Sequence, residues 1–372
     1  MRIAVDATAA AVQSAGVGRY TRELLRALLL LPDDDRYLLL SASSTAEAQQ
    51  LLRSLPPGAW RELRRLPASE RLMTALWQRL RIPLPVELVA GHFDVFHGPD
   101  FVVPPSRGPS VVTIHDLSYI VAPQYAEPSL VAYLRSAVPR SLKRASQIIT
   151  VSASVAADLV EAYPFAEGRI RAIPNGVRPL IADRNRSAPN GPPSILIVGT
   201  IEPRKNLVTL LDAMQYVWHE IPDAQLVVAG RIGWRSEEIL RKLREACLTS
   251  RVTFVESPPD TQLELLFEEA SLFVYPSAHE GFGLPLLEAM SRDVPVIASD
   301  IPALRETADA AACFVNAFDS EALGNEIVRL LADPELCADL VQAGRQRVAK
   351  HSWAETARRT RNAYQAAANG KT

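Results

Sequence analysis

Short apolar runs alternate with longer amphipathic stretches along most of the chain. The runs Ile3–Val5, Ser110–Ile114 and Ser194–Val198 are rich in branched residues and have the length of buried strands. The stretches Arg19–Leu31 and Leu207–Trp218 carry apolar residues at the spacing of one helix face. Strands that alternate with helices are typical of a parallel sheet covered on both sides. The pattern therefore predicts an α/β protein.

This alternation runs through two cycles, separated by a stretch without periodicity. The first cycle has further predicted strands at Arg36–Leu40, Phe93–Phe96, Gln147–Val151 and Arg169–Ile173. The second has further predicted strands at Gln225–Ala229, Val252–Val255, Ser271–Tyr275 and Val294–Ala298. Between the cycles, Arg178–Pro193 contains four prolines and an Asn-Gly pair, which favour an interdomain linker. The run Glu321–Ala367 is predicted to be helical, with breaks near Pro334 and Ser352.

Length and composition fit two globular domains. The chain has 372 residues, of which 48% are hydrophobic and 22% charged, so each half can bury a core of its own. A formal net charge of −2 argues against a general nucleic-acid binder. The three cysteines have no metal-ligand spacing and favour a reducing compartment. No signal peptide or membrane-spanning run is recognised, so a cytoplasmic protein is expected.

The stretch His279–Met290 is the most informative local sequence. It follows a predicted strand, and Gly281 and Gly283 allow tight turns and close approach by a ligand. Pro285 suits the first turn of a helix, whose unpaired N–H groups can bind a phosphate. Glu280 and Glu288 place one carboxylate on each side of this candidate anion site. For Glu288 alone, a favourable interaction with the helix dipole is the favoured interpretation, and only the full stretch favours a binding role.

Two further loops carry candidate phosphate-binding features. Arg204 and Lys205 are adjacent cations between a predicted strand and a predicted helix, a place that suits a diphosphate. A solvated pair of charges is the alternative there. Gly16 and Gly18 precede the first predicted helix, but without the third glycine of a dinucleotide fingerprint. A flexible helix entry explains these two glycines equally well.

His115 and Asp116 follow directly after the predicted strand Ser110–Ile114. In an open parallel sheet, ligands bind outside the carboxyl ends of the strands, so both side chains occupy a candidate cleft position. A histidine at such a place can equally be a structural hydrogen-bond donor.

Two charged stretches allow other interpretations. Trp60–Ile82 carries six arginines against two glutamates, with Leu72, Met73, Leu76, Trp77 and Leu80 at helical spacing. Such a helix suits an anionic membrane surface, although an ordinary surface helix packed on the core fits the pattern slightly better. Asp33-Asp34-Asp35 contains an Asp-x-Asp pair that could hold a divalent cation, but a solvated turn is the favoured interpretation.

Five motifs occur in a fixed order along the chain, written here in one-letter code: GVGRY from Gly16, TIHDLSY from Thr113, IPNGV from Ile173, GTIEPRKN from Gly199 and HEGFGLPLLEAM from His279. The last contains a Glu-x7-Glu pattern, Glu280 to Glu288. In this order the motifs resemble the retaining glycosyltransferases of family 4, which have the GT-B fold. The resemblance covers nearly the whole length of the chain.

The resemblance implies two Rossmann-like domains that face a central cleft. An acceptor-side domain would span residues 1–178, a linker 179–193 and a donor-nucleotide domain 194–352. The last helix, 353–372, would cross back to the first domain, with its turn near Trp353.

The resemblance also implies roles for single residues. Arg204 and Lys205 would hold the donor diphosphate, Glu288 the ribose and Glu280 hydroxyls of the transferred sugar. Backbone N–H groups of Phe282, Gly283 and Leu284 would face phosphate and sugar. His115 would approach the donor sugar, and Gly16 would let the first domain's loop close on the diphosphate.

One position departs from the family pattern. Many members have Gly-Arg where this chain has Gly199-Thr200, so one phosphate-facing cation is absent. The sequences GTIEPRKN and GVGRYTRELL, the latter near the N-terminus, look most like those of bacterial mannosyltransferases of polysaccharide and O-antigen assembly. The expected donor is thus GDP-mannose and the expected acceptor a glycan or polyprenyl-linked glycan, with the protein at most peripheral on the inner membrane face.

The expected chemistry needs no metal or other cofactor, because Arg204, Lys205 and helix N-termini can stabilise the departing diphosphate. Retention by a covalent intermediate needs a carboxylate near the anomeric carbon, for which Asp116 is the only nearby candidate. Same-face attack is the preferred route. The alternatives are another donor such as a UDP- or ADP-sugar, a glycosidic synthase or phosphorylase, and an inactive sugar-nucleotide-binding subunit.

Overall fold

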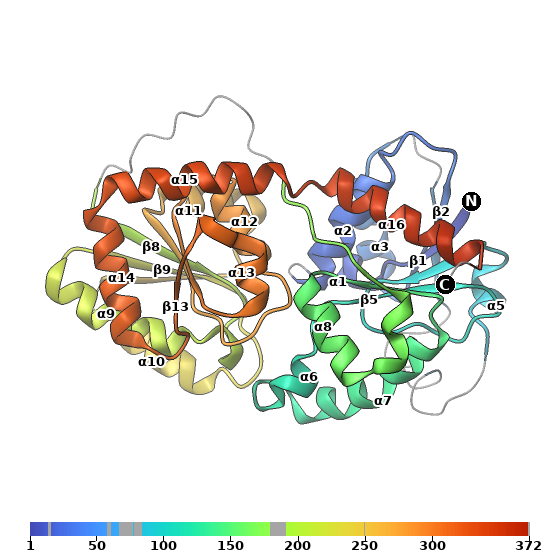
Figure 1. The fold of residues 1–372 in the computed structure, drawn as a ribbon, viewed down its shortest axis with the longest axis horizontal. Helices are drawn as coiled ribbons and strands as arrows, with labels where there is room; N and C mark the ends of the chain where they lie inside the picture. The colour runs from blue at the N-terminus through green and yellow to red at the C-terminus, as the bar shows by residue number, and fades with distance from the viewer. Residues whose placement is uncertain are drawn as a thin grey trace. The chain divides into compact units, whose positions relative to one another are not determined.

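The computed structural model describes residues 1–13, 16–57, 61–66, 77, 84–178, 191–248 and 250–370. These residues fold into two compact units. Unit 1 comprises Met1–Ile120, Ser129–Gly176 and Trp353–Thr372, and unit 2 comprises Val121–Pro128 and Val177–Ser352. Each unit is a parallel sheet with helices packed on both faces (Figure 1). The α/β architecture predicted from the alternating pattern is confirmed.

The sheet of unit 1 has the order β3-β2-β1-β4-β5-β6-β7, and all neighbouring strands are parallel. Its strands are β1 (Arg2–Asp6), β2 (Arg36–Ser41), β3 (Arg61–Arg65), β4 (Val95–Gly98), β5 (Ser110–Ile114), β6 (Gln147–Thr150) and β7 (Ile170–Ala172). The larger helices of the first half are α1 (Thr8–Val12), α2 (Val17–Leu28), α3 (Thr45–Ser54), α7 (Pro128–Arg144) and α8 (Ala153–Ala162). The short helix α6 (Ser118–Val121) runs from unit 1 into the segment that belongs to unit 2.

The sheet of unit 2 has the order β10-β9-β8-β11-β12-β13, again entirely parallel. Its strands are β8 (Ser194–Val198), β9 (Gln225–Gly230), β10 (Val252–Glu256), β11 (Leu272–Tyr275), β12 (Val296–Ser299) and β13 (Cys313–Val315). Its helices include α9 (Leu207–Glu220), α10 (Glu237–Cys247), α11 (Asp260–Glu269), α12 (Leu284–Met290), α13 (Pro302–Ala308), α14 (Ser320–Ala332) and α15 (Pro334–Ala349). One core cluster joins Ile195 and Ile197 of the sheet to Leu210 of α9, Leu243 of α10 and Ile327 of α14.

The last helix, α16 (Trp353–Ala368), belongs to unit 1. It packs beside α2 (Figure 1). Tyr364 of α16 is fully buried, and its hydroxyl lies 2.7 Å from Nδ1 of His97. The expected return of the final helix to the first domain is therefore confirmed.

Several elements were not predicted from the pattern, among them α1, α3, β3, α7 and β13. The strand β3 also corrects an expectation, because Arg61–Arg65 lies at the edge of the sheet rather than in the basic amphipathic helix assumed for Trp60–Ile82. Arg64 there donates to the backbone oxygens of Val89 and Ala90, both at 3.0 Å. The other residues of that stretch, apart from Leu66 and Trp77, lie outside the described residues. Linker positions 179–190 do as well.

Two of the three carboxylates of the acidic triplet form ion pairs within unit 1. Asp35 is 8% exposed and binds the N-terminal ammonium group of Met1 at 2.6 Å. Nε of Arg361, on α16, lies 2.8 Å from Asp33 Oδ2 and 2.7 Å from Asp35 Oδ2. Cations of the chain itself thus pair with Asp33 and Asp35, so the solvated-turn interpretation is wrong for these two carboxylates, whereas Asp34 is exposed. The triplet anchors the two chain ends of unit 1.

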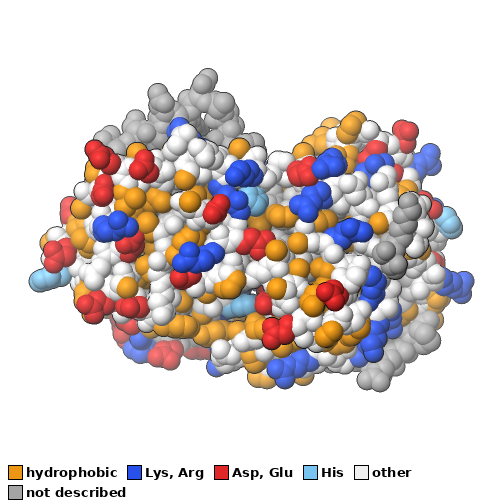
Figure 2. Space-filling model, viewed as in Figure 1, with side chains coloured by type: hydrophobic (Ala, Val, Ile, Leu, Met, Phe, Trp, Pro, Cys, Tyr) orange, Lys and Arg blue, Asp and Glu red, His pale blue; other side chains and the backbone are white. Residues whose placement is uncertain are grey.

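Acidic, basic and apolar side chains are interspersed over the face drawn in Figure 2, so this face carries no large patch of a single charge. Within the described part of the chain, no helix is both long enough and apolar enough to cross a bilayer.

Candidate active site

The strand order of unit 2 marks one place for a ligand. β8 lies between β9 and β11, so the connections from β8 and β11 leave toward opposite sides of the sheet. In open parallel sheets, ligands bind outside the carboxyl ends of strands at such a reversal. The loop that follows β8 contains Arg204 and Lys205, and the loop that follows β11 contains Glu280. Topology alone therefore brings these predicted site residues to one edge.

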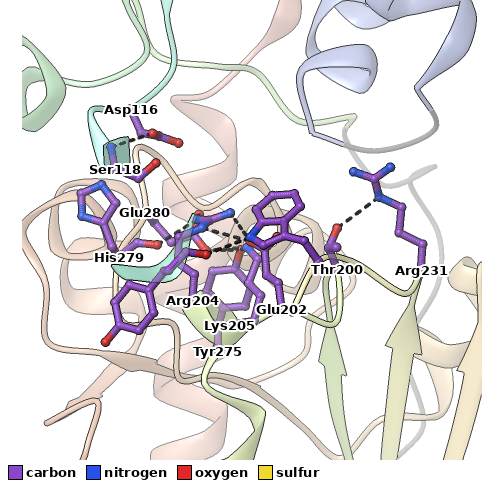
Figure 3. A network of polar contacts seen from close by, with 12 residues as sticks. Asp116, Ser118, Thr200, Glu202, Arg204, Lys205, Arg231, Tyr275, His279 and Glu280 are labelled. Atoms are coloured by element: carbon purple, nitrogen blue, oxygen red, sulfur yellow. Dashed lines mark hydrogen bonds and ion pairs between the residues drawn. The ribbon is translucent and has the colours of Figure 1, made fainter. Parts of the chain in front are cut away.

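The three side chains form one buried ion-pair cluster (Figure 3). Lys205 Nζ lies 2.5 Å from Glu280 Oε1, and Arg204 Nη1 lies 3.0 Å from Glu280 Oε2. The side chains of Lys205 and Glu280 are only 12% and 9% exposed. Each oxygen of Glu280 thus accepts from a different cation. This arrangement favours the binding interpretation of Arg204 and Lys205 over a solvated pair of charges.

Backbone geometry explains why the two loops meet. Pro203–Lys205 forms a single 3-10 turn that ends at Asn206, whose φ of 55° lies in the left-handed region. The Asn206 amide donates to the backbone oxygen of Pro276 at 3.1 Å and to that of Ala317. Asparagine tolerates this backbone conformation better than other non-glycine residues. Asn206 therefore fixes the loop after β8 against the loop after β11.

Two residues that sequence reasoning did not select complete the cluster. Glu202, 1% exposed, binds Nη2 of Arg204 at 2.7 Å and its Nε at 3.0 Å. Tyr275 is the last residue of β11, and its hydroxyl accepts from Lys205 Nζ at 2.6 Å and donates to Glu280 Oε1 at 3.0 Å. Glu202 stands two positions before Arg204 in GTIEPRKN, and this proximity was the available signal. For Tyr275 the only signal was its place at the end of a strand.

Burial and charge act in opposite directions on the titration of this cluster. Burial alone would raise the pKa of Glu280, but the charges of Arg204 and Lys205 outweigh it and lower that pKa to about 2. Burial also lowers the pKa of Lys205, and the neighbouring Glu280 offsets only part of that effect. The pKa of Tyr275 is raised well above its usual value by burial and by the charge of Glu280. Glu280 is therefore a stable carboxylate at neutral pH.

The glycine-rich turn after Glu280 presents backbone donors. The N–H groups of Phe282, Gly283 and Leu284 donate to no acceptor in the described part of the chain. Gly283 has φ +94°, a backbone conformation that favours glycine, and a Cβ there would lie 2.6 Å from Leu304 Cδ2, the end of a flexible side chain. The helix predicted after the turn is present as α12, with Pro285 in its first turn, but it has only seven residues. Its dipole is correspondingly short, and free N–H groups carry most of its attraction for anions.

Glu288 lies in α12 and is 5% exposed. Its backbone oxygen accepts from Ser291 Oγ at 2.9 Å and from Arg292 Nη1 at 3.0 Å. The carboxylate is thus carried by a short helix whose end is fixed by side chains. Its position in the second turn of α12 is the one expected from the Glu-x7-Glu spacing.

The candidate residues of the first half belong to unit 1. His115 follows β5, and its Nε2 lies 2.7 Å from the backbone oxygen of Pro99, which can only accept. Nε2 therefore carries the proton. Burial lowers the pKa of His115, partly offset by the hydrogen bond to Pro99 and by the charge of Asp116, so the ring is neutral at pH 7. Nδ1 is consequently the ring nitrogen that can accept a hydrogen bond. The Tyr20 ring holds His115 edge-on, with 4.7 Å between centroids.

Gly16 and Asp116 occupy loop positions in the same unit. Gly16 precedes α2 with φ +57°, a conformation that favours glycine, and an added Cβ would meet no atom within 4 Å. The Asp116 carboxylate accepts from the backbone N–H of Ser118 at 2.9 Å and so closes a local turn. Gly16 is thus required for its backbone conformation, and Asp116 has a structural hydrogen bond.

The cluster in unit 2 offers a defined chemistry. One guanidinium and one ammonium group, bound by carboxylates and a phenol, lie beside backbone N–H groups that have no acceptor among the described residues, at the carboxyl end of a parallel sheet. Such groups bind and stabilise a phosphate whose charge increases during a reaction. Among the described residues, no group of three or more His, Cys, Asp or Glu side chains is arranged to hold a metal ion.

Comparison with known proteins adds two family models, one for each half of the chain. The model described as Glycosyltransferase Family 4 matches residues 14–179. The model described as Glycosyl transferases group 1 matches residues 181–347 and therefore includes the whole ion-pair cluster.

Individual proteins resemble the chain over most or part of its length. It is 27% identical to the O-antigen chain mannosyltransferase B of Escherichia coli over 94% of this chain and 95% of that protein. It is 29% identical to the O-antigen chain mannosyltransferase RfbU of Salmonella typhimurium over 60% of this chain and 61% of that protein. The crystal structure of HepE from Anabaena, in complex with UDP and glucose, superposes with a TM-score of 0.74 at 18% identity, covering 98% of this chain and 99% of HepE.

Proposed function

Because the chain belongs to glycosyltransferase family 4, and is therefore a glycosyltransferase of GT-B fold, we propose that it transfers mannose from GDP-mannose to a glycan or lipid-linked acceptor. The acceptor would belong to bacterial surface polysaccharide assembly. The mannosyl donor is supported by the two O-antigen mannosyltransferases that resemble the chain.

One observation carries this proposal, namely the buried cluster of Lys205, Arg204 and Glu280 at the reversal of the strand order in unit 2. A nucleoside diphosphate that binds there gains charge-assisted hydrogen bonds from Lys205 and Arg204. The N–H groups of the glycine-rich turn supply further donors. Glu280, released in part from its cations, accepts hydrogen bonds from hydroxyls of the sugar, and Glu288 accepts from the ribose.

The chemistry follows from the same groups. As the bond between sugar and diphosphate breaks, negative charge grows on the departing phosphate, and Arg204 and Lys205 stabilise it. No metal is required for that role. His115, neutral and with Nδ1 as an acceptor, binds a hydroxyl of the donor sugar. The hydrogen bond from Ser118 gives Asp116 a structural role, which supports same-face attack over a covalent intermediate on Asp116.

UDP-sugars are the second candidate donors, because HepE, with the same fold, binds UDP and glucose. A thermal-shift comparison with GDP, UDP and ADP distinguishes the donors. A ligand at about 100 times its dissociation constant stabilises the folded protein by about 2.7 kcal/mol. We expect the largest rise of melting temperature with GDP, and a much smaller rise for Lys205→Ala. A larger rise with UDP would overturn the choice of donor, and no rise with any of the three would contradict nucleotide binding altogether.

A further inference from the structure

Arg231 occupies the position directly after β9, the neighbour of β8 in the sheet of unit 2. The backbones of the two following loops are bonded to each other. Gly199 N donates to Ala229 O at 3.0 Å, Ile201 N to Arg231 O at 2.8 Å and Gly233 N to Ile201 O at 3.0 Å. Arg231 is therefore fixed, by its backbone, to the loop that carries Arg204 and Lys205.

Two glycines make this close approach of the loops achievable. A Cβ at Gly230 would lie 1.8 Å from the backbone oxygen of Gly199, and a Cβ at Gly233 would lie 2.5 Å from Cγ2 of Thr200. At Gly230 no side chain fits without moving backbone, and at Gly233 the side chain of Thr200 would have to shift. The two glycines thus allow the loop Gly230–Gly233 to lie directly on the loop Gly199–Glu202. Arg231 is the one charged residue of Gly230–Gly233.

The side chain of Arg231 makes one weak polar contact among the described residues. Its Nε lies 3.4 Å from Thr200 Oγ1, which is long for a hydrogen bond, and the residue is exposed. No carboxylate of the described residues lies within ion-pair distance of it, including Glu256, which pairs with the adjacent Gly230 across the sheet. Figure 3 shows Arg231 beside Thr200, at the other end of the loop from Lys205. The charge of Arg231 is available to a ligand.

The charges of the cluster show why an additional cation matters. The positive charges of Arg204 and Lys205 are matched by the negative charges of Glu202 and Glu280, so these four side chains sum to zero. A nucleoside diphosphate carries more than one negative charge and is attracted by a site of net positive charge. Arg231 supplies that net charge at the same edge of the sheet.

We propose that Arg231 binds the diphosphate of the nucleotide donor, from β9, at the place where Thr200 offers no cation. This inference rests on the proposed function, because it assigns a further binding residue to the same site. Arg231 would be a binding residue that contributes to donor affinity through phosphate oxygens, without a role in fixing Lys205 or Glu280.

Calorimetric titration of the full chain with GDP, UDP and ADP tests the proposal. For the tightest of the three nucleotides, Arg231→Ala should weaken binding about tenfold, the usual effect of losing one charge-assisted hydrogen bond. Arg231→Lys should retain most of the affinity. Adding Thr200→Arg to Arg231→Ala should restore binding, because residue 200 lies beside the vacated position.

Arg329→Ala is the matched control. Arg329 is also an exposed arginine of unit 2, but it lies near Cys313 at the start of β13 and so at the opposite edge of the sheet. Its loss should leave nucleotide affinity unchanged, and an equal weakening by both variants would contradict the proposal. Unchanged binding by a folded Arg231→Ala protein, with normal binding by the wild type, would overturn this inference alone. If the wild type binds none of the three nucleotides, the proposed function fails and the role of Arg231 with it.

Discussion

At the scale of single residues, Glu280 is the centre of the candidate site. Its two oxygens neutralise two cations from another loop, and Tyr275 donates to one of them. A buried cation without a partner costs several kcal/mol of stability, so the carboxylate keeps Arg204 and Lys205 ready for an anion. Under the proposed function this pairing would loosen when a diphosphate binds. Glu280 would then contribute both to the stability of the folded protein and to the binding of the donor.

The lowered pKa of Glu280 predicts how acid affects unit 2. A carboxyl group whose pKa falls to about 2 on folding, from 4.5, contributes stability at neutral pH that is lost as the pH drops below the unfolded value. Between pH 7 and pH 3 this loss is about 2 kcal/mol. Glu280→Gln has no carboxylate to protonate at this position. Its urea midpoint at pH 7 should therefore be lower than that of the wild type, and it should fall less as the pH is lowered.

Glu355→Gln is the control for this pH dependence. Glu355 also has a lowered pKa, through its hydrogen bonds with Arg358, but it is 45% exposed and contributes little. Its replacement should leave the pH dependence of the wild type intact. An acid profile of Glu280→Gln as steep as that of the wild type would show that the ion pairs of Glu280 do not stabilise the folded state.

The residues of the site differ in how far sequence could identify them. Arg204, Lys205 and Glu280 follow from their places after strands and before helices, since parallel strands bring their carboxyl ends to one edge. Glu202 and Tyr275 depend on which way each side chain turns, and the pattern of apolar positions does not contain that information. Arg231 could not be selected from the sequence, because a single arginine after a strand is common; the proposal for it rests on its position beside Thr200 and on the neutralised cluster.

At the scale of elements, α16 shows how one helix joins distant parts of unit 1. Arg361 binds Asp33 and Asp35, Tyr364 binds His97, and Arg359 donates to the backbone oxygen of Ala172 at 2.6 Å. These contacts reach from the turn before β2 to β7. The helical run itself was predictable from its periodicity. Its partners were not, because Arg361 lies 326 residues from Asp35.

Removing Arg361 should destabilise unit 1 markedly. Arg361→Ala leaves the side chain of Asp35, 3% exposed, with the N-terminal ammonium group as its one cation among the described residues, and leaves Asp33 beside it. We expect a loss of about 2–3 kcal/mol in the free energy of unfolding, measured by urea denaturation. Arg358→Ala removes the same charge from the same helix, but Arg358 is 59% exposed and pairs with Glu355 on the surface. Its cost should stay below about 1 kcal/mol, and equal costs for the two variants would contradict an anchoring role for Arg361.

At the scale of the whole molecule, the alternation of strands and helices was enough to predict two parallel α/β units. The order of the strands within each sheet was not, because periodicity does not say which strands become neighbours. The segment Val121–Pro128 also escaped prediction: it comes from the first half of the chain but belongs to unit 2. Trp234 Nε1 donates to the backbone oxygen of Tyr125 at 2.8 Å and holds that segment. A contact between residues 109 positions apart cannot be predicted from the local pattern of apolar and polar residues.

We propose above all that the ion-pair cluster of unit 2 binds the donor in a retaining transfer of mannose. The most direct test incubates the protein with GDP-mannose and a polyprenyl-linked glycan and determines the anomeric configuration of the product by NMR. We predict a mannosylated product with the configuration of the donor, formed about 10²–10³-fold more slowly by Lys205→Ala. An inverted product, or no transfer from GDP-mannose by the wild type while a UDP- or ADP-sugar is used, would contradict the account.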